Sequence, residues 1–353
     1  MKPPFLNKVE EALGTKQHVI LEFNTTDRFY WPEKNLGPLS LTHFLAQYFN
    51  KMGFRVAEYA SALGLRELNL NCETKGNKKP IKNLGSAKDP VAALQKIQSL
   101  LRQRDEKWMV FVQYCEHLAP QDSMGVSASS VPGQVQVLEM LHRFSFDDAI
   151  TTGSSRVVLI SYGTPPADLI TRANGYRAIR VDLPSQEERL AFINFLEGLT
   201  DNDRFGELEE GLSPKDLATI TAGMPLAGIE SLYLAAGHQH KPITRVQVRE
   251  TKAASIAQLA QDLLEVTEPE IGFSDVAGLK SPLAFMKKLI KQIRAAHPGV
   301  PQTILFHGIP GGGKTHVAQA TANELAWPLV QMRNVRGQFV GQSERQLELV
   351  ITI

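Results

Sequence analysis

The sequence predicts an α/β fold built on a doubly wound parallel sheet. Two observations carry this prediction: short apolar runs alternate with segments of helical periodicity, and a glycine-rich loop separates a strand-like run from a helix. Four of the apolar runs have the length and the two-sided apolar character of buried strands in a parallel sheet. These runs are residues 18–23, 54–60, 108–114 and 156–162.

A group of helices is predicted after the last of these runs. Ser185 and Glu188 have the spacing of a capping box, and Ser213 with Pro214 marks a second helix start. We therefore expect an α/β core with a small helical lid, followed by a connector and a second strand–helix alternation. The expected segments are a core over 1–183, a lid-like subdomain over 184–240, a linker over 241–270 and a second core over 271–353.

In the connector, residues 248–266 are predicted to be helical. In the second core, Ser281 and Pro282 open a predicted helix with an apolar stripe along one side. The stripe consists of Met286, Leu289, Ile290 and Ile293.

Composition excludes several classes of protein. The 353 residues carry a formal net charge of +1, so no overall field favours nucleic acid or an anionic membrane. Cys72 and Cys115 form neither a disulfide framework nor a metal-ligand spacing. No apolar run reaches the length of a membrane span, and residues 1–14 lack the core of a signal peptide. We expect a reducing compartment, the cytoplasm or an equivalent such as the plastid stroma, with no membrane partner and no nucleic acid.

The most informative motif is the loop between the strand predicted at 303–307 and the helix predicted at 316–326. Its spacing, G-x-x-x-x-G-K-[ST], is that of a phosphate-binding loop, and a strand before it and a helix after it are the context such a loop requires. Glycines let backbone amides converge on phosphate oxygens, and the helix N-terminus favours an anion. The residues predicted to bind the nucleotide here are Gly308, Ile309, Pro310, Gly311, Gly312, Gly313, Lys314, Thr315 and His316. A chance match in a glycine-rich turn is the alternative reading.

Two of these side chains have distinct predicted roles. Lys314 should reach the β- and γ-phosphates, and the Thr315 hydroxyl should ligate Mg²⁺. ATP and Mg²⁺ are therefore the expected cofactors, and the fold class becomes that of a P-loop NTPase.

Three segments, 273–290, 308–315 and 337–347, resemble the AAA ATPases in order and spacing. The resemblance implies that backbone at Val276 and Gly278 lies against the adenine. It also implies a pore loop, in which an aromatic side chain grips a threaded polypeptide. The residues matching the pore loop are Phe339, Val340 and Gly341. Taken singly, the first segment could be a plain loop and Phe339 an ordinary core residue.

Hydrolysis in this family needs an acidic pair, a polar sensor and an arginine from a neighbouring subunit, all after the pore loop. Their absence before Ile353 predicts a fragment whose longer parent is the ATPase. By the same resemblance, the parent would form a homo-oligomeric ring, a hexamer, that remodels a protein substrate.

The first module resembles a degenerate AAA core. Gln113 and Tyr114 stand where the family has its acidic pair, and Thr164 stands where it usually has asparagine. Residues 24–40 contain no G-K-[ST] and too few glycines for an amide nest, so no ATP is expected here. Arg172 and Arg177 lie near the family's trans-acting arginines but are expected to be surface residues. Glu116 and His117 are expected to be loop residues without a catalytic role.

An inactive module before an active one is loosely similar to some cyanobacterial and plastid AAA proteins. The leading hypothesis is an ATPase that remodels proteins. The alternatives are a non-hydrolysing, ATP-responsive scaffold or adaptor, and a nucleic-acid remodeller of similar fold, against which the charge balance argues.

Overall fold

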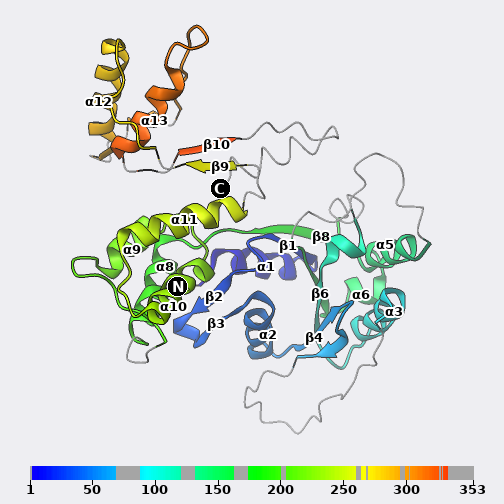
Figure 1. Cartoon of the computed structure of the whole chain (residues 1–353). Coiled ribbons are helices and arrows are strands. Elements are labelled where there is room, and N and C mark those ends of the chain that lie inside the picture. The colour runs from blue at the N-terminus through cyan, green and yellow to red at the C-terminus, as the bar shows by residue number, and fades with distance from the viewer. Residues whose placement is uncertain are drawn as a thin grey trace. The chain divides into compact units, whose positions relative to one another are not determined.

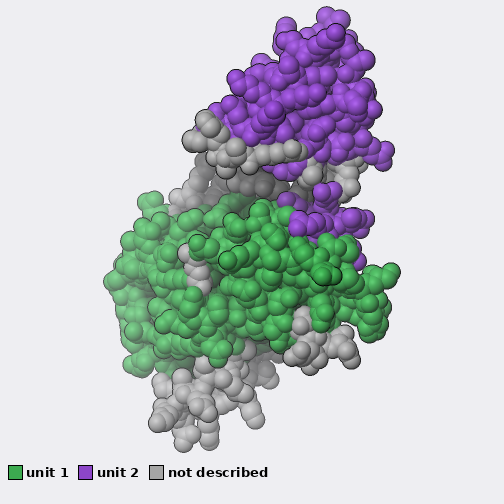
Figure 2. Space-filling view, turned by 90° about the vertical axis from the view of Figure 1, so that its left-hand side faces the viewer, with its two compact units in different colours: residues 1–244 green, residues 245–353 purple. Residues whose placement is uncertain are grey.

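The computed structural model describes residues 2–68, 88–120, 132–162, 174–199, 204–259, 264–267, 269–294, 299–301, 303–325, 327 and 329–332. Backbone contacts divide the chain into two compact units, residues 1–244 and 245–353, which Figure 2 distinguishes by colour.

Unit 1 is built on a six-stranded sheet in the order β5-β4-β6-β7-β1-β8. Figure 1 labels β4, β6, β1 and β8 of this sheet. The strands are β1 (His18–Phe23), β4 (Arg55–Ala60), β5 (Gly64–Glu67), β6 (Trp108–Gln113), β7 (Arg156–Ile160) and β8 (Tyr176–Val181). Edge strand β5 is antiparallel to β4, and the other neighbours are parallel. The chain winds first to one side of β1 and finally crosses to the other side at β8. The predicted doubly wound parallel sheet is thus confirmed.

Helices cover both faces of this sheet. They are α1 (Pro4–Gly14) and α2 (Leu41–Lys51) on one face, and α3 (Pro90–Leu101) and α5 (Pro132–Phe144) on the other, with the short helices α4 (Cys115–Leu118) and α6 (Asp148–Thr151). On β6, Val110 and Val112 pack in the same cluster as Leu94 of α3, whereas Met109 and Phe111 pack in the cluster of α1 and α2. Because side chains alternate between the faces of a strand, burial on both faces requires the continuous apolar runs seen in the sequence.

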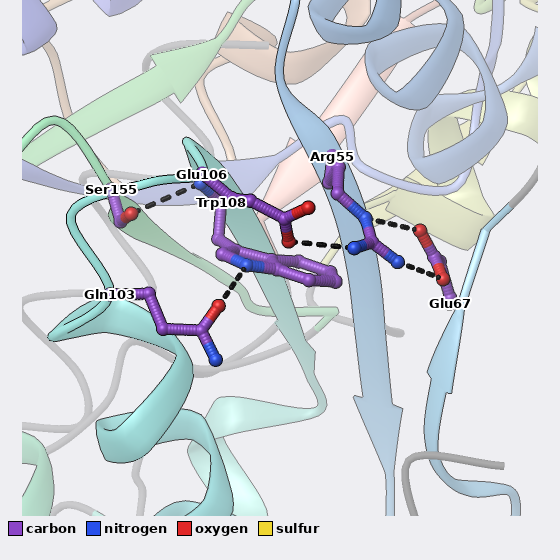
Figure 3. A network of polar contacts seen from close by, with 6 residues as sticks. All are labelled: Arg55, Glu67, Gln103, Glu106, Trp108 and Ser155. Atoms are coloured by element: carbon purple, nitrogen blue, oxygen red, sulfur yellow. Dashed lines mark hydrogen bonds and ion pairs between the residues drawn. The ribbon is translucent and has the colours of Figure 1, made fainter. Parts of the chain in front are cut away.

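A polar network joins three strands at the edge of the sheet where β4 and β6 begin (Figure 3). The Arg55 guanidinium donates to both carboxylate oxygens of Glu67, at 2.9 and 2.8 Å, and to Glu106 at 2.6 Å. It also lies over the Trp108 ring, 4.4 Å from the centroid, while the Trp108 indole nitrogen donates to Gln103 at 3.0 Å. Two carboxylates raise the pKa of Arg55 against the effect of burial. The paired and stacked guanidinium therefore fixes β5 and β6 to β4.

Between β1 and α2 the chain forms a two-stranded antiparallel hairpin, which the sequence analysis did not predict. The hairpin consists of β2 (Arg28–Trp31) and β3 (Leu36–Ser40), joined through the 3₁₀ turn η1 (Pro32–Lys34). Its Phe29, Trp31 and Leu36 side chains are buried in the same cluster as α1 and α2.

A helical subdomain follows the sheet. It consists of α8 (Gln186–Glu197), α9 (Pro214–Ile220) and α10 (Leu226–Gln239). Both predicted helix starts are confirmed: Ser185 with Glu188, and Ser213 with Asp216, form complete capping boxes. Each box satisfies backbone N–H groups at a helix start that would otherwise lack partners.

The described elements of unit 2 are α11 (Arg245–Leu259), β9 (Leu264–Thr267), α12 (Lys280–Arg294), α13 (Lys314–Leu325) and β10 (Leu329–Met332). The predicted stripe of α12 is confirmed, since Met286, Leu289 and Ile290 are buried and Ile293 packs against them. Among the described helices, none is long and apolar enough to cross a membrane.

Two predictions for unit 2 were wrong. Of the helix expected over 248–266, the structure describes a helix as far as Leu259, and residues 264–267 form a strand that pairs antiparallel with β10 instead. Residues 303–307 were expected to be a strand but have no regular structure in the described chain, and the Leu305 side chain is 89% exposed. An apolar run becomes a central strand only when neighbouring strands cover it. In the described part of unit 2, the paired strands are β9 and β10, and neither pairs with these residues.

His18 is a buried polar anchor of the sheet in unit 1. Its Nδ1 accepts from the Val157 backbone N–H at 3.0 Å, which leaves Nε2 to donate to the Phe144 carbonyl oxygen at 3.0 Å. Burial, reinforced by Arg156, lowers the pKa of His18 from 6.5 to about 4. A protonated ring could not accept from Val157, so the fold needs the neutral form.

We predict that unit 1 loses stability as the pH falls. The unfolded chain binds a proton at His18 near pH 6.5, whereas the folded chain does so only near pH 4. The stabilisation is therefore complete above pH 6.5 and declines between pH 6.5 and 4, by about 3 kcal/mol in total. Urea unfolding measured across this pH range checks the prediction. His18→Gln should remove this part of the pH dependence, while exposed His117→Gln should retain it.

Candidate functional site

The predicted phosphate loop lies at the N-terminus of α13. Gly311 and Gly313 have φ angles of 75° and 79°, a region that glycine enters far more readily than other residues. The Gly312 N–H donates to the Ile309 carbonyl at 3.2 Å, and the Val317 N–H donates to the Gly313 carbonyl at 3.0 Å, the first helical bond. The loop therefore turns tightly and leads directly into a helix of 12 residues.

Lys314 lies across this loop. Its Nζ donates to the carbonyl oxygens of Gly308 and Ile309, at 3.1 and 2.7 Å. The surrounding residues Gly308, Ile309, Pro310, Gly311, Gly312, Thr315 and His316 are exposed. An ammonium group, a helix N-terminus and glycine amides thus meet at one solvent-accessible turn, a combination of donors and positive charge that suits an anion.

The segment predicted to face the base is held close to the loop. Val276 is buried in an apolar cluster that includes Val317 and Ala320 of α13. Gly278 has a φ of 80°, and Leu279 follows it in the chain. A Cβ atom added to Gly313 would lie 3.1 Å from Cδ1 of Leu279, so this segment and the glycine loop are in close contact. The structure therefore brings together the two predicted nucleotide-binding segments.

The Leu279 contact was not foreseen from the sequence. No local sequence pattern specifies this contact, because it joins residues 34 positions apart. The pore-loop residues Phe339, Val340 and Gly341 lie outside the described residues.

In unit 1, Gln113 and Tyr114, which were expected to replace an acidic pair, make contacts of other kinds. The Gln113 side-chain amide donates to Glu58 at 2.6 Å and to Thr42 at 3.4 Å. Tyr114 has a left-handed backbone conformation, with φ of 54°, and its exposed ring lies 4.5 Å from that of Tyr162. Within the described ranges, no three His, Cys, Asp or Glu side chains are grouped so as to hold a metal ion.

The remaining candidate residues of unit 1 occupy structural positions. Glu116 and His117 lie in the short helix α4, not in the expected loop. Glu116 is buried, and its carboxylate accepts from the Tyr162 backbone N–H at 3.0 Å. Burial raises the pKa of the neighbouring Cys115 thiol. Arg177 lies on β8 and pairs with Glu11 at 3.0 Å. Cys72, Thr164 and Arg172 lie outside the described residues.

Comparison with known protein families agrees with this geometry. Residues 304–353 match the family described as ATPase family associated with various cellular activities (AAA). Residues 187–261 match the AAA+ chaperone, second helical domain. The chain is related to the AAA ATPases.

Individual AAA relatives are more distant. The proteasome-associated ATPases of Mycobacterium tuberculosis (strain ATCC 25618 / H37Rv) and Mycobacterium bovis (strain BCG / Pasteur 1173P2) are each 27% identical over 206 residues, which cover 50% of this chain and 30% of theirs. The proteasome-associated ATPase of Mycobacteroides abscessus is 30% identical over 116 residues, covering 26% of this chain and 19% of its own length. The chain therefore spans less than a third of the curated relatives it matches.

The turn at Gly313 gives a testable prediction for the AAA-type loop. Gly313→Ala should lower the free energy of unfolding of unit 2 by about 1–2 kcal/mol, because alanine disfavours positive φ and its Cβ would crowd Leu279. Gly272→Ala in the same unit is the matched control, since its Cβ would meet neighbours only at 3.5 Å or more. Thermal unfolding followed by circular dichroism makes the comparison. Equal losses for the two variants would contradict the proposed strain.

Proposed function

We propose that unit 2 binds ATP with Mg²⁺ at the loop Gly308–Thr315. The observation that supports this most strongly is the meeting of Lys314, the two left-handed glycines and the start of α13 at one exposed turn. Within the described residues, the Lys314 ammonium donates to two loop carbonyls and is paired with no carboxylate. It is therefore able to exchange weak acceptors for phosphate oxygens.

The proposed roles follow from these positions. Backbone amides over Gly311–Lys314 would bind phosphate oxygens, and Lys314 would neutralise their charge. The Thr315 hydroxyl, exposed at the first turn of α13, is proposed as a Mg²⁺ ligand. Bound Mg²⁺ would supply further charge neutralisation between phosphates. Backbone at Val276 and Gly278 is proposed to contact the base.

For the whole protein, we propose ATP hydrolysis coupled to the remodelling of a protein substrate in a homo-oligomeric ring, with Phe339, Val340 and Gly341 as its pore loop. The relationship to the AAA ATPases and the match to a chaperone helical domain support this proposal. The degenerate nature of unit 1 and a reducing compartment belong to the same proposal.

A second candidate is a nucleotide-responsive scaffold. It is favoured by the first module, whose sheet edge has Gln113 and Tyr114 in place of an acidic pair. ATP turnover by the whole protein distinguishes the two candidates, because a scaffold would bind ATP without hydrolysing it.

The proposed site predicts that Lys314→Ala weakens ATP binding at least tenfold, through the loss of a charged contact worth more than about 1.4 kcal/mol. Calorimetry with a non-hydrolysable ATP analogue and Mg²⁺ measures this change. Lys291→Ala removes an exposed lysine of α12 and should leave the affinity unchanged. Equal affinity of the Lys314 variant and the unmodified chain would refute the site.

A further inference from the structure

The turn after β1 in unit 1 is closed by its own side chains. Thr25 Oγ1 donates to the Ser161 carbonyl at 2.7 Å, and Asn24 Nδ2 donates to the Asp27 carboxylate at 2.9 Å. The chain then enters the β2–β3 hairpin before α2 begins at Leu41. In unit 2, by contrast, the glycine loop runs directly into α13. The hairpin thus follows β1 at the point in the chain where a phosphate loop would be expected.

Asp27 joins this turn to the helical subdomain. Its carboxylate is 3% exposed and accepts four hydrogen bonds. Oδ1 accepts from the backbone N–H groups of Arg28 and Ala227, at 2.7 and 2.8 Å. Oδ2 accepts from Asn24 and from the Leu226 N–H, at 2.9 and 3.1 Å. Leu226 and Ala227 are the first two residues of α10, so a side chain of the β1–β2 turn supplies the acceptor that this helix start requires.

All four hydrogen-bond partners of Asp27 are donors. An ionised carboxylate can accept all four bonds, so this arrangement favours the ionised form. Burial raises the pKa of Asp27, while the hydrogen bonds from Ala227, Asn24, Arg28 and Leu226 oppose that rise. Removing either the buried carboxylate or its hydrogen-bond donors is strongly destabilising, because the polar groups that remain are then buried without partners.

The hairpin makes two further contacts with the same subdomain. Arg28 Nε donates to Glu230 of α10 at 2.9 Å, an ion pair that is partly exposed. The Tyr30 ring lies against Phe195 and Phe192 of α8, with ring centroids 5.0 and 6.0 Å apart. Three successive parts of the chain, the turn and two residues of β2, therefore contact two helices of the subdomain.

The space left between the hairpin, the N-terminal end of α1 and the helical subdomain is small. It is a cavity of about 70 Å³, whose lining includes Asp27, Asp182 and Glu188. Ligand pockets of nucleotide size are several times larger, at roughly 300 Å³ or more. The lining carries three carboxylates and one guanidinium, that of Arg28, and this excess of negative charge disfavours phosphate.

We infer that Asp27 and the β2–β3 hairpin form an intramolecular latch that fixes the helical subdomain of unit 1 to its sheet without any ligand. The Asp27 carboxylate takes the place that an external anion would otherwise have at a helix start. This inference does not depend on ATP binding at Lys314.

The test is amide hydrogen exchange in the full chain without nucleotide, comparing Asp27→Asn with the unmodified protein. Asparagine has nearly the same shape, but either orientation of its amide places an NH₂ group against two donors. We expect exchange in α8, α9 and α10 to rise about tenfold or more, with the strands β4, β6 and β7 unchanged. Asp89→Asn is the matched control: Asp89 caps α3 by accepting from Ala92 at 2.8 Å, and asparagine caps a helix equally well.

An increase confined to the first turn of α10, with α8 and α9 as protected as before, would overturn the latch and leave Asp27 an ordinary helix cap. If Asp27→Asn does not fold, Arg28→Ala decides the question, because it removes only the ion pair to Glu230. A twofold to fivefold rise in exchange over α10 would support the latch, in line with a partly exposed ion pair. No rise in that variant would overturn it.

Discussion

The first N–H groups of a helix need acceptors, and the two units meet this requirement in different ways. In unit 1, α10 receives the buried carboxylate of Asp27 from a turn about half the chain away in sequence. In unit 2, α13 follows an exposed glycine loop crossed by the Lys314 ammonium. The first arrangement is closed by the protein itself, and the second leaves donors and positive charge accessible to a soluble anion. The proposed division of roles between the two units rests on this difference.

Much of the unit 1 fold could be predicted from the sequence. Runs such as 108–114 are apolar on both faces, and only a covered parallel sheet buries both faces of a strand. The helix starts at Ser185 and Ser213 could be predicted from the sequence, because a capping box involves residues only three positions apart. Strand β8 was missed, since Tyr176–Val181 has charged and apolar residues interleaved and its pairing with β1 is a tertiary contact. The same tertiary dependence explains why 303–307, an apolar run without paired neighbours, was wrongly predicted to be a strand.

In the candidate site, too, local features could be predicted from the sequence, whereas tertiary contacts could not. The spacing of Gly308, Gly313, Lys314 and Thr315 was readable because a phosphate loop is a local motif with local backbone requirements. The packing of Leu279 near Gly313 depends on how α12 and α13 associate, which no local pattern specifies. Asp27 was missed for the same reason, since 199 residues separate it from Leu226. The nucleotide-binding roles of the loop remain predictions.

The most direct test of the account is labelling with an acyl-phosphate derivative of ATP, which transfers its acyl group to a lysine beside the bound phosphates. Digestion and mass spectrometry of the labelled chain locate the modified lysine. The account predicts modification of Lys314 that excess ATP with Mg²⁺ prevents, and no ATP-sensitive modification of Lys2 or Lys8 on the N-terminal segment of unit 1. ATP-sensitive labelling of Lys2 or Lys8, or labelling of Lys314 that ATP does not prevent, would contradict it.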